Sequence, residues 1–108
     1  MARLPNPTKK TLNAQDLLEV DRVIHEPARL ALMAVLAACE SADFVYLRNA
    51  TSMTQGNLSA HLRKLEQVGY VFIEKRFVDN KPNTLCHLTE KGRAAFKQYR
   101  AQLVRLVR

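Results

Sequence analysis

Long apolar segments are missing from this sequence of 108 residues. No uninterrupted apolar stretch approaches the roughly 20 residues that a membrane-spanning helix needs, so we expect no association with a membrane. The basic residues near the N-terminus are not followed by an apolar stretch, which argues against a secretory signal. We therefore expect a cytoplasmic protein.

Cysteine and histidine are scarce and scattered. The two cysteines, Cys39 and Cys86, form no C-x-x-C pair, and the histidines stand alone at His25, His61 and His87. None of these spacings fits a zinc site, so no metal and no other cofactor is expected. Because disulfides are rare in the cytosol, we interpret both cysteines as ordinary core or surface residues.

Catalytic arrangements are missing as well. No Ser/His/Asp set and no pair of carboxylates stands at a spacing typical of catalysis, so the sequence does not predict an enzyme. There is no internal repeat and no low-complexity segment. The length is that of one domain, and the apolar content of 47% suffices for a small core that a partner chain would help to stabilise.

Positive charge is concentrated in one half of the chain. Residues 1–53 contain six Lys and Arg and six acidic residues, whereas residues 54–108 contain eleven and four. The whole net charge of +7 therefore belongs to the second half. Such asymmetry indicates a polyanionic partner, although a basic surface that only keeps the protein soluble would give the same count.

Apolar periodicity and capping residues predict a mainly α-helical first half. We expect a flexible arm at 1–11, a short helix within 12–24, and a buried helix whose first turn contains Pro27. A further short helix is expected after Asp43, whose side chain can cap it.

The next predicted helix, over residues 54–68, has an apolar face and an unusual opposite face. Leu58, Leu62 and Leu65 fall within a narrow arc of the helical wheel and form a buried stripe. Gly56 and Ala60 lie opposite this stripe, although a glycine costs a helix roughly 1 kcal/mol relative to alanine. Small residues there would let the helix backbone come close to a ligand.

Duplex DNA is a ligand that suits this face, because a helix in the major groove meets base edges with its N-terminal turns. Asn57 can pair with adenine, Ser59 can hydrogen-bond several bases, and Gln55 is a third candidate reader. Arg63 and Lys64 can bind phosphate, and Arg63 can also bind guanine. The alternative is an ordinary solvated helix face with a chance glycine.

A β-hairpin is predicted after this helix. The segment VFIEKRFV, residues 71–78, is rich in β-branched and aromatic residues, DNKPN at 79–83 has the composition of a turn, and TLCHL is a returning strand. We expect Arg76 on the first strand and Lys81 at the tip to contact DNA, although such lysines also protect a hairpin from edge pairing. The candidate DNA-binding residues are Thr54, Gln55, Gly56, Asn57, Ser59, Ala60, Arg63, Lys64, Arg76 and Lys81.

The last predicted helix, capped by Thr89, contains an apolar seam at spacings of three and four residues. Such a seam is typical of a coiled coil, and if exposed it favours a partner helix. The alternative is a helix that packs back on its own core. The candidate dimer-interface residues are Leu12, Leu17, Phe96, Tyr99, Leu103 and Leu106.

Three segments together resemble a winged helix-turn-helix transcriptional regulator of the MarR/ArsR-like kind. They are IHEPARLALMAVL at 24–36, GNLSAHLRKLEQVGYV at 56–71 and LTEKGRAAF at 88–96. The resemblance spans roughly residues 17–100 and implies DNA binding, homodimerisation and a second motif helix that reads DNA. The chain departs from the metal-sensing branch because it lacks paired cysteines near the short helix.

The sequence thus predicts a mainly α-helical protein with a small β-hairpin, in which a three-helix core carries a wing and flanking dimerisation helices. The arm at 1–11 precedes a winged helix DNA-binding domain at 12–88 and a dimerisation helix at 89–108. The expected function is sequence-specific binding of double-stranded DNA as a homodimeric transcriptional regulator. We expect this regulator to repress transcription. The alternative is a winged helix module that binds another protein or RNA. No motif identifies a small-molecule effector.

Overall fold

The computed structural model describes residue 15 and residues 18–107. Within them, the fold is mainly α-helical with a β-hairpin, as predicted. A third, two-residue strand at Ala42–Asp43, which was not predicted, joins the hairpin in an antiparallel sheet of order β1-β3-β2. The elements are α2 (Pro27–Ala37), β1 (Ala42–Asp43), α3 (Phe44–Thr51), α4 (Gln55–Gln67), β2 (Val71–Val78), β3 (Lys81–Leu88) and α5 (Glu90–Val107).

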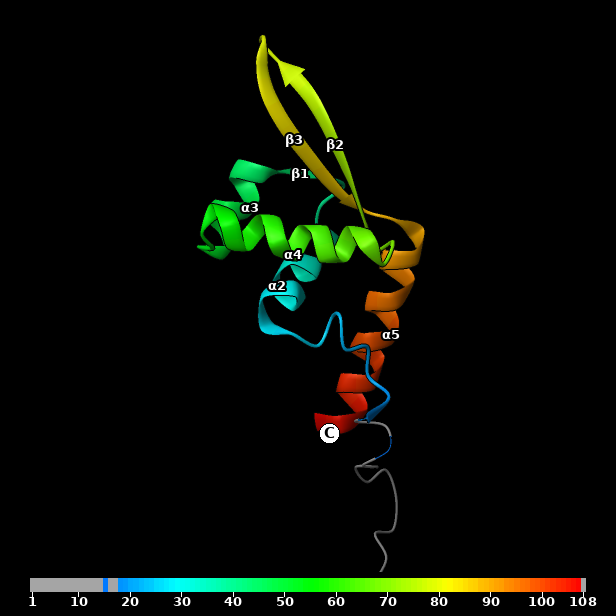
Figure 1. The fold of residues 1–108 in the computed structure, drawn as a ribbon. Helices are drawn as coiled ribbons and strands as arrows, with labels where there is room; N and C mark the ends of the chain where they lie inside the picture. Colours follow the sequence, from blue (N-terminus) through cyan, green and yellow to red (C-terminus); the bar gives the residue numbers. More distant parts are fainter. Residues whose placement is uncertain (1–14, 16–17, 108) are drawn as a thin grey trace, which may run out of the picture.

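Helix α4 and the hairpin are neighbours in the fold, and α4 is in contact with β2. Figure 1 shows β2 and β3 projecting beyond the helices as a wing, while α4 lies across the base of this hairpin. The helix α5 leads away from the end of β3 in the opposite direction. Among the described residues, no helix combines the length and apolar character that a bilayer-spanning segment needs.

The predicted leucine stripe forms the inner face of α4. Leu58, Leu62 and Leu65 are buried and belong to the same apolar cluster as Leu32 and Leu36 of α2. Each such side chain contributes roughly 1.5–3 kcal/mol when it is removed from water. The stripe therefore fixes α4 on the core and determines which of its residues face outward.

Capping residues place the ends of the helices as predicted. The Asp43 carboxylate accepts a hydrogen bond from the backbone N–H of Tyr46 at the start of α3, at 2.7 Å. The Thr54 hydroxyl accepts one from the backbone N–H of Asn57 at the start of α4, at 3.1 Å. Gly69, with a φ of 83°, follows the end of α4 in the left-handed conformation that glycine tolerates best.

The hairpin turn is tighter than predicted. Asp79 and Asn80 both have positive φ, 51° and 63°, which is the geometry of a two-residue type I′ turn. The prediction of a five-residue turn over 79–83 was wrong, because β3 begins at Lys81 and includes Pro82. Lys81 is therefore the first residue of a strand that follows the turn.

Helix α5 packs on its own chain through its first half. Phe96 and Tyr99 expose only 8% and 1% of their surface, and the Tyr99 hydroxyl is hydrogen-bonded to Nδ1 of His25 at 2.6 Å. Because both side chains belong to the core of the chain, the prediction that they form an exposed dimer seam was wrong. The coiled-coil spacing reflects packing of α5 on its own domain in this part of the helix.

The remaining predicted interface residues have different positions. Leu103 and Leu106, in the last turns of α5, are half-buried against the core cluster. Their neighbour Val104 exposes 51% of its surface. Leu12 and Leu17 lie outside the described residues, as do residues 13, 14 and 16 of the helix predicted within 12–24. In the described part of this range, residues 19–24 form turns and bends, so the prediction of a helix over 19–24 was wrong.

A glycine allows α5 to start close to the end of α4. Thr89 caps α5 as predicted, since its hydroxyl accepts a hydrogen bond from the backbone N–H of Gly92 at 2.9 Å. A Cβ atom on Gly92 would stand 2.1 Å from the carbonyl oxygen of Tyr70. The first turn of α5 can therefore touch the backbone between α4 and β2 only because residue 92 has no side chain.

The segment before α2 is held to this same region by polar contacts. The Tyr70 hydroxyl donates a hydrogen bond to the carboxylate of Asp21, whose other oxygen accepts one from the backbone N–H of Val23 at 2.8 Å. Burial, together with the bond to Asp21, raises the pKa of Tyr70 to about 12. The Tyr70 hydroxyl therefore stays protonated, as a donor to Asp21, over the physiological range.

Candidate nucleic-acid interface

The outer face of α4 carries the predicted reading residues. Gly56, Asn57 and Ala60 are exposed, and Ser59 is half-buried at the edge of the face. The residues predicted on or beside this helix are Thr54, Gln55, Gly56, Asn57, Ser59, Ala60, Arg63 and Lys64. These residues lie outside the leucine stripe, and all of them except Ser59 are exposed, so this face is available to a ligand.

Packing within the chain does not explain the glycine in the first turn of α4. A Cβ atom on Gly56 would meet nothing within 4 Å. An alanine would therefore fit here and would favour the helix. Gly56 therefore lowers the stability of the helix and leaves open space on the outer surface, next to the exposed Asn57.

The first turn of α4 is also suited to a negatively charged ligand. The backbone N–H groups at a helix start have no partner within the helix, and together they carry a partial positive charge. The Thr54 hydroxyl satisfies one of them through Asn57. The other N–H groups can receive a phosphate oxygen, and Arg63 and Lys64 add two cations along the exposed side of the helix.

The two faces of the wing carry different side chains. In the register of the hairpin, Lys75 pairs with Thr84 and Phe77 pairs with Pro82 on the face that continues from the core residue Ile73. Arg76 pairs with Asn83, and Val78 with Lys81, on the opposite face. The predicted contacts Arg76 and Lys81 therefore share the face that is turned away from α4, where Arg76 Nε donates to Asn83 Oδ1 at 3.0 Å.

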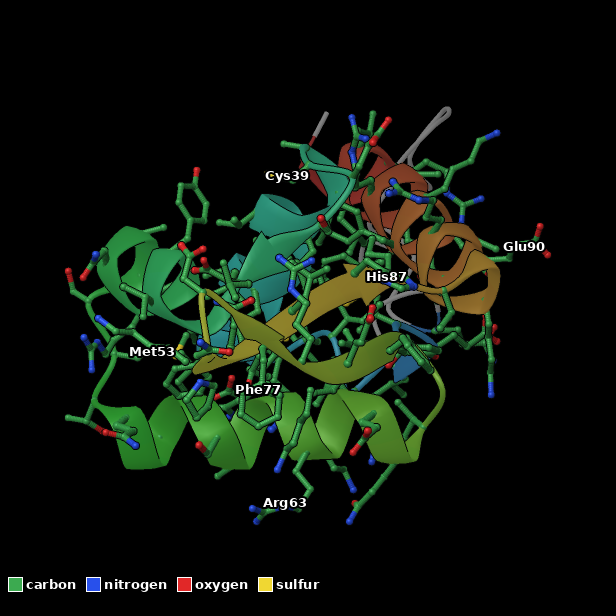
Figure 2. All side chains as sticks on the ribbon, turned by 90° about the horizontal axis from the view of Figure 1, so that it is seen from above. Cys39, Met53, Arg63, Phe77, His87 and Glu90 are labelled. Carbon is green, nitrogen blue, oxygen red and sulfur yellow. The ribbon has the colours of Figure 1, made fainter. Side chains whose placement is uncertain are left out.

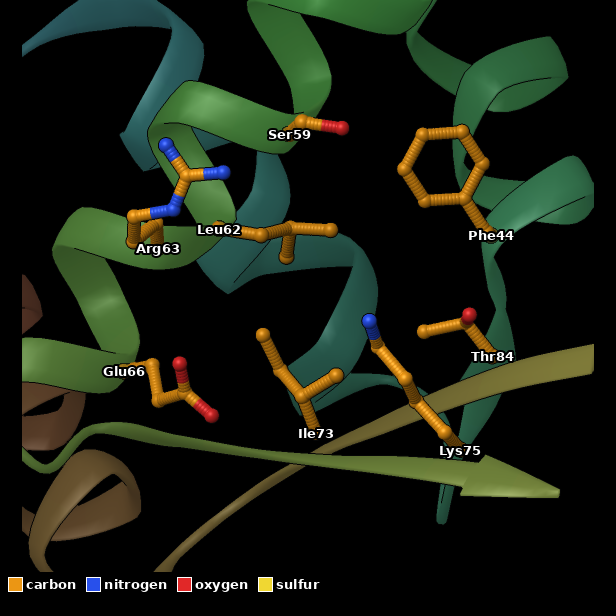
Figure 3. Close-up of a pocket in the computed structure, with 8 residues that line it drawn as sticks. All are labelled: Phe44, Ser59, Leu62, Arg63, Glu66, Ile73, Lys75 and Thr84. Atoms are coloured by element: carbon orange, nitrogen blue, oxygen red, sulfur yellow. The ribbon is translucent and has the colours of Figure 1, made fainter.

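Lys75 is a residue of this surface that the predicted contact set does not contain. It lines a groove of about 480 Å³ that lies between α4, α3 and the wing. Figure 3 shows its amino group directed into the space between β2 and α4. The lining residues are Phe44, Ser59, Leu62, Arg63, Glu66, Ile73, Lys75 and Thr84. Alternation from the inward-facing Val71 and Ile73 would have identified Lys75 from the sequence.

Arg63 of α4 and Phe77 of the wing both lie on this surface. Figure 2 looks down on the hairpin and shows the Arg63 side chain extending from α4 away from the body of the molecule. The same view shows Phe77 on the side of the wing that faces α4. The helix, the groove and one face of the wing thus form a continuous surface on one side of the protein.

Most of the excess positive charge lies in the last helix and not on the surface formed by α4 and the wing. Residues 54–88 contain five Lys and Arg and three acidic residues, whereas residues 89–108 contain six and one. Figure 2 shows α5 on the far side of the hairpin from α4. The charge asymmetry of the sequence therefore points to α5 more than to the predicted reading helix. Within the described part of the chain, no cluster of His, Cys, Asp and Glu is arranged to hold a metal ion.

Comparison with known proteins agrees with this geometry. Residues 28–107 match the family described as winged helix DNA-binding domain. The chain is 34% identical over 85 residues to MJ0432, an uncharacterized protein of Methanocaldococcus jannaschii, and the match covers 79% of this chain and 92% of that protein.

Solved structures have the same fold. A transcriptional regulator homologue from Pyrococcus horikoshii OT3 is similar with a TM-score of 0.79 and 29% identity, over 83% of this chain and 91% of that one. The apo form of wild-type MarR from E. coli is similar with a TM-score of 0.65 and 20% identity, over 82% and 71%. The likeness to MarR concerns the fold alone, whereas the family match covers most of the sequence. This chain belongs to the family of winged helix DNA-binding domains.

Proposed function

We propose that this chain is a homodimeric transcriptional regulator that binds a specific duplex DNA sequence and represses by occupying promoter DNA. The observation that carries the proposal is the outer face of α4, where small and polar side chains precede two cations above a buried leucine stripe. Membership of a DNA-binding family supports the choice of DNA, and the Pyrococcus horikoshii protein, described as a transcriptional regulator homologue, supports a role in transcription.

In this proposal the first turns of α4 read bases in the major groove. Gly56 and Ala60 let the helix backbone approach the base edges, and Asn57 makes a bidentate contact with adenine. A good bidentate pair contributes roughly 1–3 kcal/mol of discrimination against the wrong base. Gln55 and Ser59 are the further candidate readers on this face.

Cations beside the readers fix the register of the helix on the duplex. Arg63 and Lys64 extend from the exposed side of α4, and Lys75 points into the groove between α4 and the wing. One strand of the DNA backbone would lie along this groove. Arg76 and Lys81, on the other face of the wing, would contact phosphates across the adjacent minor groove.

Dimerisation would double the number of base contacts, because one recognition helix covers too few base pairs for selective binding. Two recognition helices about 34 Å apart would meet successive major grooves on one side of the duplex. We place this contact at the end of α5, where the half-buried Leu103 and Leu106 lie beside the exposed Val104. Residues 12–88 would then bind DNA, and residues 89–108 would supply the dimerisation helix together with Leu12 and Leu17.

A binding assay with three variants tests the reading face. Duplexes selected by the wild-type chain from a random pool are titrated in a gel shift at two salt concentrations. We expect Asn57→Ala to lose roughly 1–3 kcal/mol of affinity and to relax the preference at one base pair, and Lys64→Ala to weaken all sequences alike. Gln98→Ala, which removes an exposed amide from α5, should bind as the wild type does. If wild-type protein binds no duplex at low salt, the alternative of a module for protein or RNA is favoured.

The dimer has a separate test. Val104→Asp adds a charge to an exposed position near the end of α5, so the fold of one chain should tolerate it. In a dimer contact the same charge would be buried without a partner, which is costly. Sedimentation at micromolar concentration should show a dimer for the wild type and for Ala94→Asp, an exposed position earlier on α5, and a monomer for Val104→Asp. A monomeric wild type would contradict the arrangement.

A further inference from the structure

The wing carries a large apolar side chain near its outer end. Phe77 exposes 74% of its surface, one residue before the end of β2. Single exposed apolar residues are common on proteins, so exposure alone argues little. The neighbours of Phe77 and the face on which it lies indicate a more specific role.

Phe77 belongs to an apolar edge near the turn. Its cross-strand partner is Pro82, so both side chains lie on the same face of the hairpin. The type I′ turn at Asp79 and Asn80 keeps the two strands close together beyond this pair. The outer end of the wing is therefore narrow, and the face nearest α4 ends in a phenyl ring beside a pyrrolidine ring.

Cations lie on both faces of the hairpin beside this apolar edge, and one acidic residue, Asp79, stands in the turn. Lys75 precedes Phe77 on the same face, and Arg76 and Lys81 lie on the opposite face. A narrow element with an apolar edge between cations complements the minor groove, where sugar walls and base steps lie between two rows of phosphates. Proteins that bend DNA from the minor groove insert Phe or Pro side chains between base steps in this way, beside contacts made by Arg and Lys.

We propose that Phe77, supported by Pro82, is an apolar wedge that enters the minor groove next to the segment read by α4 and partly unstacks one base step. The proposal rests on the proposed function, because it requires α4 to hold the duplex beside the wing. A wedge favours steps that are easily kinked, such as TA and CA/TG. It would thereby add sequence preference outside the base pairs that α4 contacts, and it would bend the duplex.

The experiment compares Phe77→Ala with the wild-type full chain on a duplex that the wild type selected. End-labelled DNA reports bending by energy transfer, and 2-aminopurine at the expected step reports unstacking by increased fluorescence. We expect Phe77→Ala to lose about tenfold in affinity, as removal of one aromatic contact area implies, and to lose the bend and the fluorescence increase. Its salt dependence should stay unchanged, because no phosphate contact is removed.

Two further variants serve as controls. Phe77→Leu keeps an apolar side chain and should retain most of the bend, whereas Val78→Ala, on the opposite face beside the turn, should behave as the wild type does. If the wild type binds DNA but Phe77→Ala has the same affinity and the same bend, the wedge is refuted while the proposed function stands. If the wild type binds no duplex, the proposed function fails and the wedge fails with it. Conversion of the dimer to a monomer by Phe77→Ala would also overturn the wedge, since Phe77 would then be a contact between copies.

Discussion

Replacing Gly56 with alanine should make the protein more stable and a weaker DNA binder. The residue lies in the first turn of α4, and a Cβ atom there meets nothing within 4 Å inside the chain. Alanine is favoured over glycine by about 1 kcal/mol within a helix, and by somewhat less in the first turn. We therefore expect the free energy of unfolding of Gly56→Ala to rise by about 0.5–1 kcal/mol.

The effect on DNA binding should have the opposite sign. A methyl group on the outer face would hold the backbone of α4 away from the base edges and lengthen the hydrogen bonds of Asn57. Loss of one good base contact corresponds to about 1–3 kcal/mol, or roughly five- to 150-fold in the dissociation constant. Urea unfolding and DNA titration on the same preparation measure both quantities.

The reverse substitution on the same face is a matched control. Ala60→Gly removes a methyl group, so it should lower the free energy of unfolding by about 1 kcal/mol without obstructing the approach to DNA. If Gly56→Ala gains stability while it loses affinity, damage to the fold cannot explain the weaker binding. If Gly56→Ala binds selected duplexes as tightly as the wild type, close approach of the α4 backbone is not how this protein reads DNA.

Three further predictions concern the wing and the core. Gly92→Ala should lower the free energy of unfolding by about 2 kcal/mol, because the new methyl group would overlap the carbonyl oxygen of Tyr70, and equal or greater stability in urea would contradict the close contact. Lys81→Ala should reduce the slope of log affinity against log salt by roughly 0.9 through loss of one phosphate contact, and an unchanged slope would show that Lys81 touches none. Burial raises the pKa of Cys86 to about 11, so at pH 8 its protonated thiol should react with a disulfide reagent only on unfolding. The half-buried Cys39 should react in the folded protein, and simultaneous reaction of both cysteines would contradict this difference.

Local signals explain why much of the fold is predictable from the sequence. Leu58, Leu62 and Leu65 recur at helical spacing, and this spacing alone separates the buried face of α4 from its outer face. Thr54 and Gly69 mark the two ends of that helix because a side-chain oxygen is needed at the start and a residue tolerant of positive φ after the end. The candidate reading face follows from these few residues.

The features that were mispredicted depend on contacts distant in sequence. The spacing of Phe96 and Tyr99 is the same whether the partner helix belongs to another chain or to the same core, so the pattern could not distinguish the two. The composition of residues 79–83 indicates a turn without specifying that Asp79 and Asn80 alone adopt positive φ. The close contact of Gly92 with Tyr70 has no signature in either local segment.

The central claim is that the outer face of α4 reads a specific duplex sequence. Its most direct test is repeated selection from a random duplex pool, followed by sequencing, with the wild-type chain and with Asn57→Ala in parallel. We expect the wild type to enrich a partly palindromic site whose half-sites are about one helical turn apart. We expect Asn57→Ala to lose the preference for one base pair in each half-site. Enrichment of no sequence by the wild type, or of the same sequence by both proteins, would contradict the claim.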